Sequence, residues 1–303
     1  MTKPVWRGVF PAVTTQFAAD FSLDLDATRA VAAALVADGV DGLIAVGSVG
    51  ENTALSPAEK RDVTAAILDA AQGRVPVLAG LAELTTEQAR AFARDAQRLG
   101  VDGVMVMPPM VYAANAAERL AWFSAIAAAS DLPLMLYNNP PAYRNDITPP
   151  EAASLARIDT VVALKESSGD TRRFVDLHRA VGDRLTLFCG LDDVVLECVT
   201  LGAVGWVSGL SNVFPRECGR LFACAVAGER AEALSLYRWV MPLLHLDARP
   251  DLVQCIKACE AIAGRGSAVT RPPRLPLEGP VRAEIEALMA DAVAHPVAYR
   301  PAV

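Results

Sequence analysis

Histidine is rare in this sequence, which contains three: His178, His245 and His295. No HxH or HExxH pair occurs, so a histidine-based metal site and a Ser-His-Asp triad have little support. The six cysteines form no CxxC pair and lie in apolar stretches of a long chain. We therefore expect reduced thiols in the core, with neither a disulfide framework nor a metal site.

An excess of positive charge is also lacking. The chain has 28 Lys and Arg against 35 Asp and Glu, which gives a net charge of −7. Nucleic acid is excluded as an expected partner because binding it needs a basic surface. No apolar run reaches the ~20 residues that span a bilayer, and the start, MTKPVWRGVF, has no signal-type apolar core. These absences predict a cytoplasmic protein without membrane segments.

What the sequence does have is apolar residues, at 53% of 303 positions, enough for a large core. Eight short apolar runs recur along the chain, and each is continuous where a half-buried strand would alternate. Such runs are typical of parallel strands buried on both faces. They are GVFPAVT (8–14), GLIAVG (42–47), VPVLAG (75–80), GVMVMP (103–108), PLMLYN (133–138), VVALKE (161–166), LTLFCG (185–190) and GWVSG (205–209).

Helical patterns separate these runs, for example at 25–39, 56–71 and 85–100. The second begins with Ser56 as N-cap, a proline at the first helical position and a glutamate three residues after the cap. Thr85 or Thr86 caps the third. Several of these patterns end in glycine, the usual stop signal of a helix.

Eight strands, each followed by a helix, predict an α/β protein with a (β/α)8 TIM barrel. A doubly wound sheet is the competing fold, but it would use five or six strands and no GxGxxG motif occurs. We expect a catalytic barrel over residues 1–225. The remaining helical patterns predict a C-terminal helical domain over residues 226–303.

Polar and small residues follow the predicted strands at the edge where a barrel carries its catalytic groups. The segments are PAVTTQF (11–17), GSVGEN (47–52), YNNPP (137–141), CGLDD (189–193) and SGLSN (208–212), together with Lys165. This common edge is the predicted active site.

Lys165 ends the apolar stretch in VVALKESSGD (161–170). Inside the barrel it would be desolvated, which lowers the pKa of an ammonium group from about 10.4. A neutral amine can then attack a carbonyl group and form a Schiff base. The alternative is a structural salt bridge, for instance to Glu166.

Tyr137 ends the neighbouring strand, where a phenol beside a lysine can shuttle protons; the alternative is a packed core tyrosine. After the second strand, Gly47, Ser48, Val49 and Gly50 form a predicted turn. Its backbone N–H groups and the Ser48 hydroxyl could cradle a substrate carboxylate.

Three motifs together resemble the dihydrodipicolinate synthase/N-acetylneuraminate lyase family of class I Schiff-base aldolases: GSVGE (47–51), YNNP (137–140) and KESSGD (165–170). The resemblance runs from about residue 5 to 265. It implies a (β/α)8 barrel with a C-terminal helical domain, a homo-oligomer (tetramer or dimer), and no metal or organic cofactor. It also implies that Lys165 forms the Schiff base, that Tyr137 relays protons, and that Ser48 and the Val49 backbone hold the substrate carboxylate.

The sequence departs from dihydrodipicolinate synthases at three places. They carry two threonines in the turn, where this chain has Ser48 and Val49. They place a tyrosine, borrowed by the neighbouring subunit, where this chain has Pro109 and Met110, with Tyr112 two residues further on.

The third departure is the arginine that binds a second carboxylate, since the nearest here, Arg144, comes two places late. The three departures argue against lysine biosynthesis. Val49 also argues against sialic acid lyases, which keep Ser-Thr in the turn.

The motifs GSVGEN, YNNPP, LFCGLDDVVLE, GWVSGLSNVFPRE and LHLDARPDLVQCIKACEAIAGRG look most like a narrower subgroup. Its members deaminate 1-pyrroline-4-hydroxy-2-carboxylate to 2-oxoglutarate semialdehyde and ammonia in hydroxyproline degradation. The resemblance thus implies a small cyclic imino acid as substrate. One alternative is an aldolase or dehydratase acting on pyruvate or a 2-oxo sugar acid, and another is a catalytically dead barrel used as a regulator.

Rim residues after the last two strands are further candidates. Gly190, Ser208 and Gly209 are predicted to contact the substrate. Asp192 or Asp193 could contact the substrate hydroxyl or the released amine, or could equally form the N-cap and first turn of the helix that follows.

Two more polar residues have predicted structural roles. We expect His245 to make an oligomer or interdomain contact. Glu51 is expected to hold its turn by accepting backbone N–H bonds.

Overall fold

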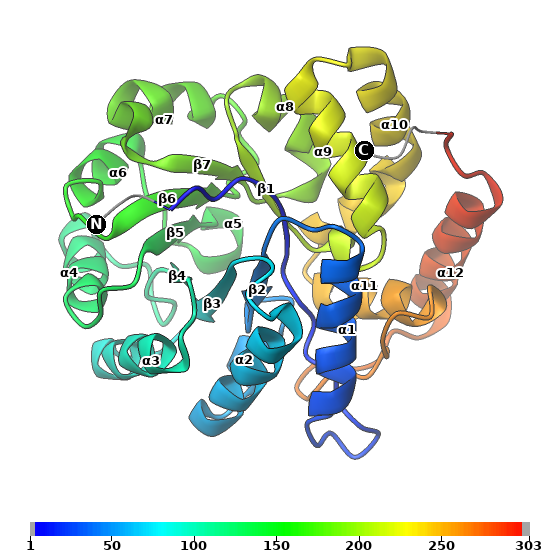
Figure 1. Ribbon diagram of the computed structural model, residues 1–303, viewed down its shortest axis with the longest axis horizontal. Helices are drawn as coiled ribbons and strands as arrows, with labels where there is room; N and C mark the ends of the chain where they lie inside the picture. Colours follow the sequence, from blue (N-terminus) through cyan, green and yellow to red (C-terminus); the bar gives the residue numbers. More distant parts are fainter. Residues whose placement is uncertain (1–3, 299–303) are drawn as a thin grey trace.

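Eight parallel strands form one sheet in the computed structural model, which describes residues 4–298 (Figure 1). The order is β1-β8-β7-β6-β5-β4-β3-β2, and β1 meets β2 through the Ala12–Ile44 bridge, so the sheet closes on itself. The strands are β1 (Gly8–Pro11), β2 (Leu43–Ala45), β3 (Val77–Leu81), β4 (Gly103–Val106), β5 (Leu134–Asn138), β6 (Val161–Glu166), β7 (Thr186–Cys189) and β8 (Gly205–Ser208). This confirms the predicted (β/α)8 barrel, and each strand falls on a predicted apolar run.

The continuous apolar runs have a simple cause. All six residues of β6 are buried, and so are all five of β5. Successive side chains of a strand point to opposite faces, so one face lines the barrel interior and the other packs on the helices. Both faces therefore need apolar residues, and no alternation appears in the sequence.

Helices surround the barrel, and their first turns follow the predicted signals. The Ser56 hydroxyl accepts from the Glu59 N–H, and the Glu59 carboxylate accepts from the Ser56 N–H at 2.8 Å. Thr85, not Thr86, caps its helix. The helices are α1 (Leu25–Ala37), α2 (Pro57–Ala71), α3 (Thr86–Leu99), α4 (Ala116–Ala127), α5 (Pro140–Tyr143), α6 (Pro149–Leu155), α7 (Arg173–Val181), α8 (Val195–Thr200) and α9 (Pro215–Ala227).

A helical extension follows the barrel, as predicted. It consists of α10 (Arg230–Leu244), the 3-10 turn η5 (His245–Ala248), α11 (Leu252–Ile262) and α12 (Gly279–Ala294). Figure 1 shows these helices on the side of the barrel where α1 and α9 lie, with α12 outermost. The helix α9 ends at Ala227, two residues beyond the predicted boundary at residue 225.

A buried ion pair joins this extension to the turn after β2. The Lys257 Nζ of α11 donates to Glu51 Oε1 at 3.0 Å and to the Thr15 carbonyl at 2.7 Å, with both charged side chains fully buried. Glu51 Oε2 accepts from the Arg271 N–H at 3.0 Å. Glu51 was expected to hold the turn by accepting backbone N–H bonds, and it does accept the Arg271 N–H; the ion pair with Lys257, which the sequence did not predict, also anchors the turn to the extension.

Removing one partner of this pair tests how firmly the extension holds the turn. We expect Lys257→Met to lower the free energy of unfolding by about 3 kcal/mol, because the buried Glu51 carboxylate would keep only the longer ion pair with Arg274 at 3.7 Å. Urea denaturation measures the change. The control is Arg29→Met, which breaks surface pairs with Asp26 and Asp69 and should cost less than about 1 kcal/mol. Equal losses in the two variants would contradict the anchoring role.

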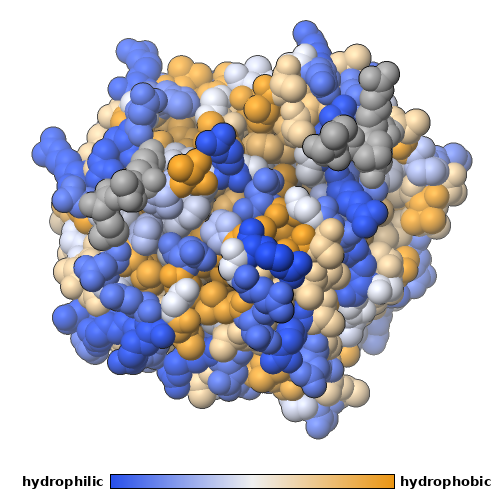
Figure 2. All heavy atoms as spheres, in the orientation of Figure 1, coloured by the Kyte–Doolittle hydropathy of each residue, from blue (hydrophilic) through white to orange (hydrophobic). Residues whose placement is uncertain are grey.

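The exposed surface, the helices and the cysteines can be compared with the predictions from composition. Figure 2 shows hydrophilic residues around the edge of one face, with apolar residues between them. Across residues 4–298, no helix combines the length and the apolarity that crossing a membrane requires. All six cysteines are buried and free, which confirms the prediction of reduced core thiols.

Candidate active site

Lys165 lies at the C-terminal end of β6, next to Tyr137 of β5. The two residues are direct partners in the strand register. The Lys165 Nζ lies 4.0 Å from the centroid of the Tyr137 ring, and the lysine is only 6% exposed. The sequence-based expectation of a phenol beside this lysine is thus confirmed by the geometry.

Glu166 points away from Lys165, as alternation along a strand requires. Its carboxylate accepts from Asn138 Nδ2 at 2.9 Å and pairs with Arg173 at 3.2 Å. Among residues 4–298, the Lys165 ammonium has no hydrogen-bond or ion-pair partner. The alternative of a Lys165–Glu166 salt bridge is therefore wrong.

Burial lowers the pKa of Lys165, since removal from water disfavours the ammonium form. The Asp247 carboxylate is the strongest of the groups that oppose this effect. An amine of lowered pKa is a better nucleophile near neutral pH, so this position can add to a carbonyl or imine carbon.

Gly190 makes room for the lysine. A Cβ atom at this position would lie 2.7 Å from the Lys165 Cγ and 2.8 Å from its Cε, and would also overlap the Ser167 hydroxyl. Contacts this short are sterically forbidden. Gly190, a predicted substrate contact, thus also serves as the wall against which the Lys165 side chain packs.

A second tyrosine, Tyr143, completes a cluster of hydroxyl groups over the lysine. Its Oη lies 2.5 Å from the Ser48 Oγ, and its ring packs edge-to-face on Tyr137 with centroids 5.7 Å apart. Burial raises the pKa of both phenols, which are therefore protonated at neutral pH. The Tyr137 Oη also accepts from Asn139 Nδ2 at 3.1 Å.

Sequence reasoning missed Tyr143. The helix α5 begins at Pro140, and a residue three places into a helical turn returns toward its start. This signal was available, since a proline at the first helical position indicates that a turn of helix follows YNN. No sequence signal indicated that Ser48 would lie opposite Tyr143.

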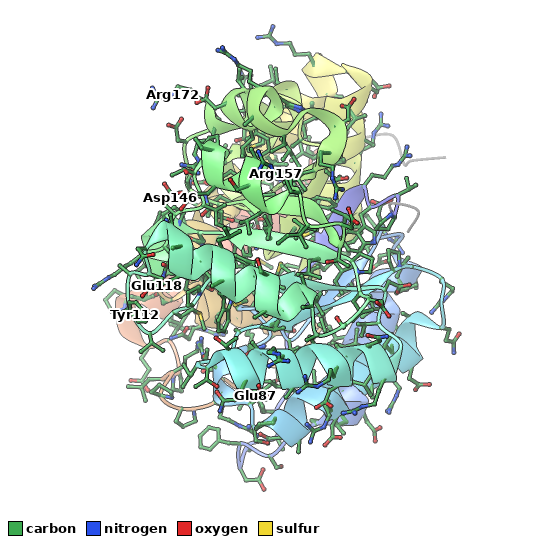
Figure 3. The ribbon with its side chains drawn as sticks, turned by 90° about the vertical axis from the view of Figure 1, so that its left-hand side faces the viewer. Glu87, Tyr112, Glu118, Asp146, Arg157 and Arg172 are labelled. Atoms are coloured by element: carbon green, nitrogen blue, oxygen red, sulfur yellow. The ribbon has the colours of Figure 1, made fainter. Side chains whose placement is uncertain are left out.

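Tyr112 does not join this cluster. It is 56% exposed, and Figure 3 shows it beside Glu118 at the edge of the molecule. A hydrogen bond to Glu118 raises its pKa. Arg144 is likewise exposed and ends α5 in a left-handed conformation. Tyr112 therefore does not replace the missing tyrosine, and Arg144 does not replace the missing arginine.

The turn after β2 presents free backbone donors. Within the described residues 4–298, the N–H groups of Ser48 and Val49 have no acceptor. Gly50 is required there because a Cβ would lie 2.8 Å from the Val13 carbonyl oxygen. Beside these residues Gly47 is buried, and the Ser48 hydroxyl adds a donor. Such a group of donors can bind a carboxylate.

Asp192 is fully buried, and both of its carboxylate oxygens have partners. They accept from Trp206 Nε1 at 2.8 Å, the Leu210 N–H at 2.8 Å and Ser208 Oγ at 3.2 Å. The N-cap of the 3-10 turn η3 (Asp192–Val194) is Leu191, and no side chain caps it. The predicted first-turn position of Asp192 and Asp193 is thus confirmed, but the predicted N-cap role of Asp192 is wrong, because its carboxylate turns inward and supports the end of β8.

Asp193 connects the barrel to the extension instead. Its Oδ2 lies 2.9 Å from His245 Nδ1, and its carbonyl accepts from the Tyr237 hydroxyl at 2.5 Å. The N-cap prediction fails here too, since Asp193 bonds across the interface. For His245, the interdomain alternative is confirmed.

Asp247 was also missed by sequence reasoning. It belongs to η5 in the extension, and its Oδ2 accepts from the Asp192 N–H at 3.3 Å. A Cβ on Gly209 would lie 2.9 Å from its Oδ1, which places the carboxylate at the ends of β7 and β8. Burial raises the pKa of Asp247 to about 6, and Lys165 opposes this rise.

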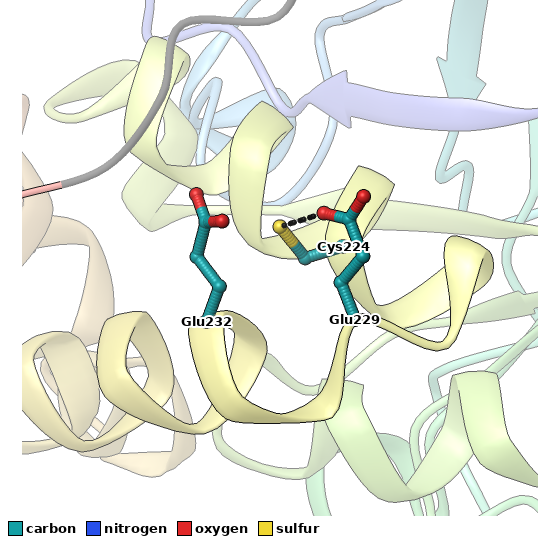
Figure 4. A group of neighbouring side chains, drawn as sticks. All are labelled: Cys224, Glu229 and Glu232. Atoms are coloured by element: carbon teal, nitrogen blue, oxygen red, sulfur yellow. Dashed lines mark hydrogen bonds between the residues drawn. The ribbon is translucent and has the colours of Figure 1, made fainter.

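One further group of acidic and thiol ligands lies on α9 and α10: Cys224, Glu229 and Glu232 (Figure 4). The Arg220 guanidinium donates to Glu232 at 2.8 and 2.9 Å and to Glu229 at 3.0 Å. Arg220 therefore already pairs with both carboxylates, and the cluster has a structural explanation.

Comparisons with known proteins agree with this geometry. Residues 5–292 match the model of the dihydrodipicolinate synthetase family. A 4-hydroxy-tetrahydrodipicolinate synthase of Sorangium cellulosum is 36% identical over 296 residues, covering 95% of this chain and 97% of that protein. An uncharacterized DapA-like lyase of Halobacterium salinarum is 33% identical, covering 94% and 93%.

Solved structures are similar over nearly the whole chain. A putative dihydrodipicolinate synthetase from Pseudomonas aeruginosa has a TM-score of 0.90 and 31% identity, covering 94% of this chain and 99% of that one. The Escherichia coli prophage protein YagE, solved in complex with pyruvate, has a TM-score of 0.90 and 28% identity, covering 95% and 98%.

Proposed function

Since the chain belongs to the dihydrodipicolinate synthetase family of lyases, we propose that it deaminates 1-pyrroline-4-hydroxy-2-carboxylate through a Schiff base on Lys165. The observation that carries the proposal is the buried Lys165, which contacts the Tyr137 ring and shares the catalytic edge with the carboxylate of Asp247 at Gly209. A substrate that bears a basic nitrogen matches a site that contains this carboxylate.

The chemistry balances with water alone as co-reactant. Lys165 adds to C2 of the cyclic imine, and the ring opens as the C2–N bond breaks with its electron pair going to nitrogen. The new Schiff base acidifies C3, and loss of the C3 proton and the C4 hydroxyl eliminates one water. The C5 amine becomes an imine after isomerisation. Two waters then release ammonia from C5 and the 2-oxo product from Lys165.

Two parts of this reaction have a matching group in the site. The N–H groups of Ser48 and Val49 with the Ser48 hydroxyl hold the carboxylate at C2. Tyr137 moves protons at C2 while Lys165 adds and leaves. The proposed reaction needs no metal or organic cofactor, because the lysine supplies the covalent chemistry.

The rim argues for this substrate over one with two carboxylates. An arginine for a second carboxylate would have to come from Arg144, which is exposed at the end of α5. Asp247 lies near Lys165 instead, and like charges in a buried site repel each other. A substrate whose nitrogen becomes an ammonium group avoids that repulsion.

An aldolase or dehydratase acting on pyruvate or a 2-oxo sugar acid is the second candidate. The similarity to YagE, whose structure contains pyruvate, favours it. Both candidate reactions proceed through a Schiff base on Lys165. They differ in the substrate, which contains a ring nitrogen only in the first.

Two assays test the proposal. The purified protein should release ammonia from 1-pyrroline-4-hydroxy-2-carboxylate, measured with a coupled dehydrogenase. Release of pyruvate from 2-oxo-3-deoxy sugar acids, without ammonia from the pyrroline, would support the second candidate. Failure of borohydride to trap any adduct on Lys165 with either substrate would overturn both.

Tyr143→Phe tests the hydroxyl cluster. Loss of the phenol removes the partner of Ser48, so we expect kcat to fall by about 10²-fold, at the low end of the effects of acid–base groups. Steady-state ammonia release measures it. The matched control is Tyr112→Phe, which removes an exposed hydroxyl and should leave kcat unchanged. A larger loss in the control would indicate that Tyr112 supplies the hydroxyl to a neighbouring subunit.

A further inference from the structure

A carboxylate from outside the barrel reaches its catalytic edge. Asp247 belongs to the extension, 82 positions beyond Lys165 in the sequence. Its Oδ2 receives the Asp192 N–H at 3.3 Å, while its Oδ1 lies over Gly209. Gly209 leaves the space that this oxygen occupies, since a Cβ there would lie 2.9 Å from it and the carboxylate would have to shift.

Asp247 keeps one carboxylate oxygen available at this edge. Asp192 has both oxygens bonded to Trp206, Ser208 and Leu210. Asp193 is turned toward His245. Among residues 4–298, the Asp247 Oδ1 has no hydrogen-bond donor, and its side chain is only partly buried.

The charge of Asp247 acts on the reacting groups. It is the strongest of the charges that favour the ammonium form of Lys165, and it also raises the pKa of Tyr137. Such effects are strong where charges are poorly screened by water. In the strand order Asp247 lies at the ends of β7 and β8, which follow Lys165 of β6 on one side, while Tyr137 of β5 follows on the other.

We propose that Asp247 binds the nitrogen of the substrate and thereby selects cyclic imines over 2-oxo acids, an inference that rests on the proposed deaminase function. The free Oδ1 accepts a hydrogen bond from the protonated ring nitrogen. When the Lys165 Nζ bonds to C2, one proton passes from Nζ to the ring nitrogen. The C2–N bond then breaks, and the amine takes a proton from water and stays paired with Asp247 as an ammonium group.

The substrate nitrogen can be tested apart from the deamination. The probe 1-pyrroline-2-carboxylate lacks the C4 hydroxyl, so it can form the Schiff base but cannot eliminate water. Pyruvate is the matched 2-oxo acid without nitrogen. Borohydride traps either adduct on Lys165, and mass spectrometry of the protein gives the rate of trapping against the concentration of each probe.

We expect Asp247→Asn to lower the trapping efficiency with 1-pyrroline-2-carboxylate by about 10- to 10²-fold, the effect of losing a charge-assisted hydrogen bond. Trapping with pyruvate should change by less than about threefold. The inflection of the pyruvate trapping rate with pH should also move to lower pH, because the carboxylate no longer favours the ammonium form of Lys165. That shift is a readout that a merely structural role would not move.

Asp251→Asn is the matched control, since Asp251 is also in the extension but pairs with Arg249 at 2.9 Å. It should alter neither trapping rate. Equal losses with both probes in Asp247→Asn, or no loss with either, would overturn the inference, as would a wild-type protein that forms no adduct with the pyrroline. If wild type traps the pyrroline but releases no ammonia from the hydroxylated substrate, the proposed function fails while the role of Asp247 stands.

Discussion

Lys165→Ala should abolish turnover and leave no adduct that borohydride can trap. The expected loss in kcat/KM exceeds about 10⁴-fold, because the variant lacks the nucleophile on which every later step depends. Ammonia release and the mass of the trapped protein are the two measurements. The fold should survive, since the substitution removes a buried cation that has no ion-pair partner among residues 4–298.

Lys165→Arg separates nucleophilicity from charge. Arginine keeps a cation and a long side chain at this position, but its pKa above about 12 keeps it protonated. We expect it to be as inactive as the alanine variant. An active arginine variant would contradict the Schiff-base role and leave Lys165 as an electrostatic group.

The pH dependence of the wild-type protein follows from the same burial. Desolvation lowers the pKa of Lys165, and the deprotonated amine is the reactive form. The rate of adduct formation should therefore rise with pH and level off at a pH below the ordinary lysine pKa of about 10.4.

Tyr137→Phe should reduce kcat by about 10²–10⁴-fold, the range of general acid–base groups. The Tyr137 phenol is buried and protonated, and its ring contacts the Lys165 Nζ. Phenylalanine keeps that ring contact and removes the proton donor alone. Steady-state ammonia release gives kcat and KM separately, and the loss should appear in kcat.

Tyr237→Phe provides a matched control in the same protein. The Tyr237 hydroxyl is bonded to the Asp193 carbonyl at 2.5 Å and to Glu197 at 2.8 Å, where the barrel meets the extension. Its removal should lower the free energy of unfolding by about 1–3 kcal/mol and leave kcat within threefold. A Tyr137→Phe variant that raises KM but keeps kcat would show that the phenol binds substrate without moving protons.

The extension emerges as part of the site. Lys257 in α11 anchors the Glu51 turn through a buried ion pair, and Asp247 in η5 brings a carboxylate to the ends of β7 and β8. Sequence changes in the extension can therefore alter both the proposed carboxylate-binding turn at Ser48 and Val49 and the proposed nitrogen contact of Asp247 without changing the barrel strands.

The sequence by itself determined the barrel fold and the pairing of Lys165 with Tyr137 at the C-terminal edge of the barrel. Strand burial on both faces requires continuous apolar runs, and helix caps depend on residues within one turn, so both can be read locally. Lys165 and Tyr137 could also be predicted as neighbours, because both end adjacent strands of a parallel barrel, where consecutive strands pair.

Only the tertiary structure decided the rest. The Ser48–Tyr143 contact joins residues 95 positions apart, and the Glu51–Lys257 pair joins residues 206 apart. Whether Asp192 turned outward to a substrate or inward to Trp206 depended on which donors β8 brought to it. Such contacts depend on how loops and the extension pack on the barrel, and no local period or turn signal encodes that packing.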